Sequence, residues 1–136
     1  MWKLLTAGAL AGALMGAGLA APATAAGEEQ TYQGVQYVCT GIGQERDNPE
    51  WAKYPAKIML TTKNGAYVAN ADITIDDAKG KRVLEATCHG PWLLVDLKPG
   101  RYRVSAKVDR YLHEGTIEVK AKGQAALTLR FWEIVG

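Results

Sequence analysis

The chain has 136 residues, of which 48% are hydrophobic and 22% are charged, and its formal net charge is +2. This nearly balanced charge excludes an electrostatic case for binding nucleic acid or a membrane surface. The chain contains only two histidines and two cysteines. We therefore expect no recognisable group of three or four metal ligands, and no cofactor is predicted.

The first 25 residues have the pattern of a secretory signal peptide. Lys3 provides a positive charge, residues 4–21 are uncharged and rich in Ala, Leu and Gly, and Pro22 ends that run. Small residues at 23 and 25 favour cleavage after Ala25. The alternative is an uncleaved membrane anchor, because the run has nearly spanning length and two Gly-x-x-x-Gly spacings. We expect cleavage, which leaves one domain, residues 26–136, in the periplasm or secreted, without stable membrane insertion.

The mature part shows the period of two that is typical of half-buried strands. After a loose leader at 26–31, strands are predicted at 35–40, 57–62, 67–76, 82–87, 92–97, 101–108, 116–120 and 125–131. We expect the last two to form a closing pair. The run 92–97 is apolar on both faces, which indicates a central strand covered on both sides. The pattern predicts an all-β fold, a seven- to eight-stranded antiparallel β-sandwich.

The sequence also predicts which side chains of one strand face the core, and it predicts a disulfide. Tyr102, Val104 and Ala106 alternate with Arg101 and Arg103, so the first three are predicted to face the core. Lys107 extends the outward cationic row. An even pair of cysteines in an exported chain predicts a disulfide, here between Cys39 and Cys88. Closing a loop of about 50 residues would stabilise the domain by roughly 4 kcal/mol. The alternative is two buried free thiols.

Three segments together resemble the carboxypeptidase regulatory-like domains: 71–80 (ADITIDDAKG), 90–94 (GPWLL) and 97–104 (LKPGRYRV). The resemblance covers about residues 66–131 and implies a transthyretin-like sandwich. Residues 41–45 (GIGQE) are similar to a stretch that precedes the domain in small exported bacterial stand-alone forms. Hydroxyisourate hydrolases of this fold end in Tyr-Arg-Gly-Ser. Residues 131–136 (FWEIVG) lack that tail, so the resemblance does not imply that activity.

The long irregular segment 41–55 is the candidate binding surface. It contains Trp51 and Tyr54 beside the charged Glu45 and Arg46. Exposed aromatic rings with polar neighbours form platforms for sugars or peptides. The alternative is that Trp51 folds back as a structural cap. In that case the search moves to the opposite rim, around His89, Pro91 and residues 111–114.

Catalytic chemistry is not expected. His89 is predicted in a loop and His113 at a hairpin end, and Ser105 is the only mature serine, on an outward strand face. The leading hypothesis is a non-catalytic exported binding or interaction module with an unknown protein, peptide or carbohydrate partner in the envelope. A structural subunit of an envelope assembly, using exposed strand edges, is the alternative. An unrecognised enzyme is the third hypothesis.

Overall fold

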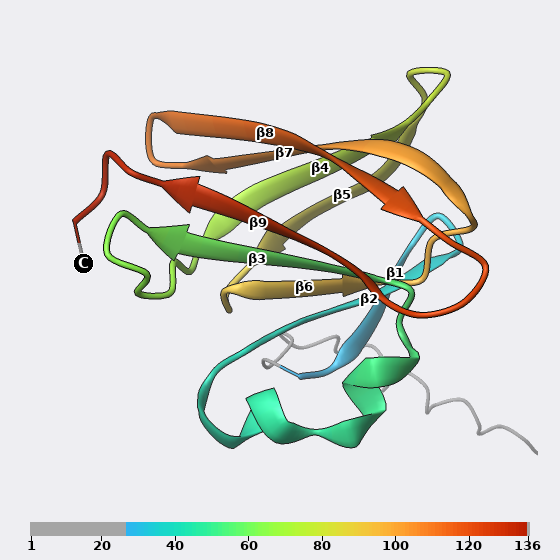
Figure 1. Ribbon diagram of the computed structural model, residues 1–136, viewed down its shortest axis with the longest axis horizontal. Helices are drawn as coiled ribbons and strands as arrows, with labels where there is room; N and C mark the ends of the chain where they lie inside the picture. The colour runs from blue at the N-terminus through green and yellow to red at the C-terminus, as the bar shows by residue number, and fades with distance from the viewer. Residues whose placement is uncertain (1–26, 136) are drawn as a thin grey trace, which may run out of the picture.

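The computed structural model describes residues 27–135, so the predicted signal segment 1–25 lies outside the described residues. Two sheets pack face to face (Figure 1). The five-stranded sheet has the order β1-β2-β6-β3-β9, with β1 (Glu29–Tyr32), β2 (Val35–Thr40), β6 (Trp92–Val95), β3 (Ala56–Thr62) and β9 (Ala125–Phe131). The four-stranded sheet has the order β5-β4-β7-β8, with β5 (Arg82–Cys88), β4 (Ala71–Asp77), β7 (Gly100–Val108) and β8 (Tyr111–Val119). The predicted all-β sandwich is therefore confirmed at this level.

The strand count of seven to eight is corrected, because residues 27–135 form nine strands. The additional strand is β1, in the segment expected to be a loose leader. It pairs with β2 through a two-residue hairpin in which Tyr32 faces Val35. Gln33 and Gly34 both have positive φ, at 46° and 89°. This backbone matches the twist that favours tight hairpins, so the turn holds β1 against β2.

The five-stranded sheet is mixed rather than purely antiparallel, which corrects the expectation of an antiparallel sandwich. β9 runs parallel to β3, from the pair Ala56 and Ala125 to the pair Thr62 and Phe131. The predicted closing pair does not form, because β8 pairs with β7 in the other sheet. The chain crosses between the sheets after β8, and a hydrogen bond of 2.8 Å from the Ala125 amide to the Pro55 carbonyl aligns the two strand starts.

The core lies between the sheets and follows the predicted alternation. The fully buried residues include Ile58 and Leu60 of β3, Ile73 and Ile75 of β4, and Val104 of β7. β6 is buried on both faces, as the apolar run at 92–97 predicted. Its second face is covered by segment 41–55, which contributes the 3-10 helices η2 (Gly43–Asp47) and η3 (Pro49–Lys53).

The disulfide between Cys39 and Cys88 is present, with the two Cα atoms 5.2 Å apart. Cys39 belongs to β2 and Cys88 to β5, so the bond joins the two sheets. Gly90 lies beside it: a Cβ atom at this position would approach the Thr40 carbonyl oxygen to 2.3 Å. Glycine is therefore required where the chain leaves β5 and passes the end of β2.

Tyr102 lies in the core, as predicted, and its hydroxyl donates to the Lys98 carbonyl over 2.7 Å. Arg103 is exposed, with only a 3.6 Å contact to Glu114. We expect Tyr102→Ala to lower the free energy of unfolding by about 3 kcal/mol, because truncation leaves a cavity. Arg103→Ala should stay within about 0.5 kcal/mol. Urea unfolding measures both, and equal losses would contradict this assignment of faces.

Candidate binding site

Segment 41–55 lies against the outer face of the five-stranded sheet rather than extending into solvent (Figure 1). Trp51 and Tyr54 pack with Val38 of β2 and Leu94 of β6. They are 7% and 2% exposed, and their rings contact each other at 6.4 Å between centroids. The expectation of exposed aromatic platforms is therefore wrong. These rings bury the apolar outer face of β2 and β6, which would otherwise contact water.

Hydrogen bonds hold both aromatic residues in place. The Trp51 indole Nε1 donates to the Glu45 carbonyl over 2.5 Å. The side-chain amide of Gln124, from the β8–β9 connection, donates to the carbonyls of Trp51 and Tyr54 over 2.9 and 3.0 Å. The segment is thus fixed at its polar groups as well as its rings, which is the structure of a cap.

Glu29 of β1 anchors the same segment electrostatically. It accepts a 2.5 Å hydrogen bond from the Tyr54 hydroxyl and forms a 3.1 Å salt bridge with Lys53. The Tyr54 hydrogen bond, followed by that from Lys53, lowers the pKa of Glu29, and the bonds to Glu29 and Glu50 raise the pKa of Lys53. Burial, together with the Glu29 contact, raises the pKa of the Tyr54 hydroxyl well above its usual value. Each shift favours the protonation state that keeps this contact at neutral pH.

The two charged residues of the predicted site, Glu45 and Arg46, have separate roles. Glu45 is half-buried, and its backbone carbonyl accepts the hydrogen bond from the Trp51 indole. Arg46 is exposed, and its guanidinium lies 5.5 Å from the ring centroid of Tyr67. The structure therefore does not bring Glu45, Arg46, Trp51 and Tyr54 together as one surface. Tyr67 had not been singled out, because it is distant from Arg46 in the chain.

The alternative rim has a different structure from the one expected. Residues 111–114 belong to β8 rather than to a turn. His113 Nε2 lies 2.7 Å from a Glu133 carboxylate oxygen, and its ring packs edge-on against Phe131. Burial raises the pKa of Glu133, but its hydrogen bonds, chiefly from His113, outweigh that and lower it. His89 is exposed and contacts Asn70 at 3.1 Å.

A hollow of about 650 Å³ opens at the end of the sandwich where β5 and β7 begin. Five connections and the ends of several strands surround it. The lining residues are Gly34, Val35, Pro55, Asp77, Lys81, Val83, Asp96, Leu97, Lys98, Pro99, Tyr102, Lys120 and Ala121. We call this hollow the end cavity. It is the candidate site that the geometry favours, because a concave surface of this size, with apolar walls and a few polar groups, is typical of small-ligand sites.

Local sequence explains the shape of the end cavity. Pro99 and Gly100 turn the chain from β6 into β7, and the Tyr102 hydroxyl holds that turn through the Lys98 carbonyl. Asp77 holds the opposite hairpin, because its Oδ1 accepts hydrogen bonds of 2.9 Å from the amides of Lys79 and Lys81. These two turns make the walls rigid, which lowers the ordering cost of binding.

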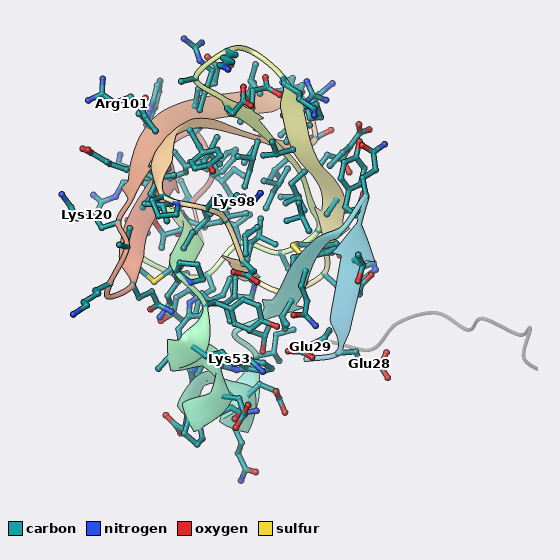
Figure 2. All side chains as sticks on the ribbon, turned by 90° about the vertical axis from the view of Figure 1, so that its right-hand side faces the viewer. Glu28, Glu29, Lys53, Lys98, Arg101 and Lys120 are labelled. Carbon is teal, nitrogen blue, oxygen red and sulfur yellow. A yellow bond between two sulfur atoms is a disulfide. The ribbon has the colours of Figure 1, made fainter. Side chains whose placement is uncertain are left out.

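Basic side chains surround the end cavity. Figure 2 shows this end of the molecule, with Lys98 near its middle and Lys120 and Arg101 at its edge. Lys81, Lys98 and Lys120 line the cavity, whereas Arg101 lines a neighbouring hollow of about 220 Å³. The three lysines come from separate connections. Their convergence was not visible in the sequence, where only the stretch 97–104 of this region was singled out.

No family model matches the chain, and no curated protein matches it significantly. The resemblance to carboxypeptidase regulatory-like domains stays a prediction. Between Gly27 and Val135, no helix is long and apolar enough to cross a membrane. The same span holds no group of three or more His, Cys, Asp or Glu side chains placed to bind a metal ion.

Proposed function

We propose that the protein is an exported, non-catalytic binding module whose ligand occupies the end cavity. The observation that carries the proposal is the cavity itself. Its volume of about 650 Å³ falls within the roughly 300–1,000 Å³ of small-molecule sites. Val35, Val83 and Leu97 provide apolar walls, and lysines and aspartates provide a small number of polar contacts.

Two features support export. The pattern of residues 1–25 is that of a cleaved signal peptide. The disulfide between Cys39 and Cys88 is of the kind that persists in an oxidising compartment. We therefore assign the module to the periplasm or the secreted fraction.

We also propose that the sandwich is transthyretin-like and belongs to the carboxypeptidase regulatory-like domains. The support is the Leu97–Val104 stretch, in which Leu97 and Tyr102 are buried and Pro99 and Gly100 form the turn. One wall of the end cavity is formed by residues of this stretch, namely Leu97, Lys98, Pro99 and Tyr102. The residues that resemble the family pattern thus form part of the cavity wall, whereas the lysines are not specified by that pattern.

A ligand-observed NMR screen of small organic fragments, with the purified protein, tests the function. Ala121 lines the end cavity and is exposed, so Ala121→Trp should obstruct it without disturbing the core. We expect fragments that bind the protein to lose at least tenfold in affinity. Ala52→Trp is the matched control, because Ala52 is an exposed residue of η3, outside the cavity.

Thermal unfolding of both variants should match that of the parent protein, since neither position is buried. If the hits bind Ala121→Trp as tightly as the parent, or if no fragment binds, the end cavity is not the binding site and the proposal fails. Binding that is lost only in Ala52→Trp would place the site on segment 41–55 instead.

A further inference from the structure

We infer that the end cavity takes a small amphiphilic organic anion, with an acidic group at the lysines and a short apolar body against the wall. This inference rests on the proposed binding function and names its ligand class. It follows from the charges around the cavity, from the groups that do or do not neutralise them, and from the apolar lining.

The three cavity lysines enter from different parts of the fold. Lys81 lies at the β4–β5 hairpin, Lys98 in the β6–β7 turn, and Lys120 directly after β8. All three line the same hollow, and Figure 2 shows Lys98 near the middle of this end with Lys120 at its edge. Ammonium groups from three directions create a positive potential over a concave surface, where it is focused toward a ligand.

None of the three amino groups forms a salt bridge with a residue in the range 27–135. Other basic residues of that range do. Lys53 pairs with Glu29 and Glu50, and Arg82 pairs with Asp76 and Glu85. Lys98 and Lys120 therefore bring ammonium groups that are unpaired within that range to a concave surface, and Lys81 has only a longer-range attraction to Asp77. An anionic ligand would supply a partner for them.

Two aspartates also line the end cavity, and they have different roles. The Asp77 carboxylate is engaged by the amides of Lys79 and Lys81, and these hydrogen bonds lower its pKa. The carboxylate thus holds the hairpin and keeps its negative charge. Asp96 is exposed at the rim. Three ammonium groups consequently face two carboxylates, and the remaining net charge of about +1 favours an anion over a cation.

The apolar part of the ligand follows from the cavity wall. Val35 and Val83 are half-buried and Leu97 is buried, so each presents hydrocarbon at the base of a lysine-bearing rim. The Tyr102 hydroxyl is occupied by the Lys98 carbonyl, which leaves its ring to contact a ligand. A chain of about six carbons matches this surface, and burying its methylenes adds to the affinity of the ligand.

The test compares four probes of equal chain length: hexanoate, hexyl phosphate, hexanol and hexylamine. Each is titrated into the purified protein while the NMR signals of Val83, Leu97 and Tyr102 are followed. We expect one or both anions to bind at least tenfold more tightly than hexanol, and hexylamine to bind least. Raising the salt concentration from 20 to 500 mM should weaken anion binding severalfold, because screening reduces the attraction of exposed charges.

A combined Lys81→Gln, Lys98→Gln and Lys120→Gln variant should weaken anion binding at least tenfold. The same change at Lys107, an exposed lysine of β7 that does not line the cavity, should leave it unaltered. Tighter binding of hexanoate than hexyl phosphate assigns a carboxylate, and the reverse assigns a phosphate.

Equal binding of hexanol and the anions, or no effect of the triple variant, would overturn the inference while the binding function stands. If none of the four probes shifts the cavity signals and the fragment screen also finds no ligand there, both fail. If the screen finds only neutral or cationic ligands in the cavity, the function stands and the anionic class is rejected.

Discussion

Removing the disulfide by the double substitution Cys39→Ala and Cys88→Ala should lower the free energy of unfolding by about 2–5 kcal/mol. The bond closes a loop with a sequence separation of 49 residues, which corresponds to roughly 4 kcal/mol of lost chain entropy in the unfolded state. Because it joins β2 to β5, its loss also removes a covalent link between the two sheets. The effect is a large fraction of the stability of a domain this size.

Denaturant unfolding of the oxidised parent, the reduced parent and the double variant measures this effect. The reduced parent keeps both sulfur atoms, so it separates the loss of the bond from the loss of packing volume. We expect the reduced parent to lose most of what the double variant loses. The oxidised parent should weigh two hydrogen masses less than the reduced one. Equal stability of oxidised and reduced parent would contradict the prediction.

The strands and their inward faces could be predicted because each is a local pattern. Alternation in 101–108 placed Tyr102 and Val104 in the core and Arg103 outside it, as observed. Pro99 and Gly100 are residue types that favour a turn, and the chain turns there between β6 and β7. The disulfide could be predicted from an even pair of cysteines in a chain with a signal-peptide pattern.

Long-range pairing could not be predicted in the same way. The parallel pairing of β3 with β9 depends on where the chain crosses between the sheets. The sequence of β9 does not indicate which strand it pairs with. β1 depends on positive φ at Gln33, a conformation that a glutamine does not signal. The end cavity depends on the meeting of several turns, each of which looks ordinary by itself.

Segment 41–55 is irregular, as predicted, and of its two interpretations the structure supports the cap rather than the exposed aromatic platform. Trp51 and Tyr54 are surrounded by charged residues in the sequence, which is typical of exposure. The apolar outer residues Val38 and Leu94 needed a cover, and these two rings provide it. The double-faced apolar run at 92–97 was the signal that something must pack there.

Trp51→Ala should therefore destabilise the protein by about 3 kcal/mol or more, at the lower end of what large aromatic truncations cost in cores. The substitution uncovers Leu94 and Val38, removes the ring contact with Tyr54 and deletes the hydrogen bond from Nε1 to the Glu45 carbonyl. Trp51→Phe keeps most of the buried area and loses that hydrogen bond. It should cost about 1 kcal/mol on account of the unpaired carbonyl, plus a smaller packing loss.

Arg46→Ala is the matched control, since Arg46 lies on the same segment but is exposed, with a long 3.4 Å hydrogen bond to the Gly43 carbonyl and a 5.5 Å contact to Tyr67. It should change stability by no more than about 0.5 kcal/mol. Urea unfolding of the three variants, with anion titration of each below its unfolding transition, separates the two roles of the segment. If Trp51 is a cap, the folded Trp51→Ala variant still binds the anion, because Trp51 does not line the end cavity, and its unfolding midpoint alone moves. An unchanged midpoint together with lost binding would return Trp51 to the role of a ligand contact.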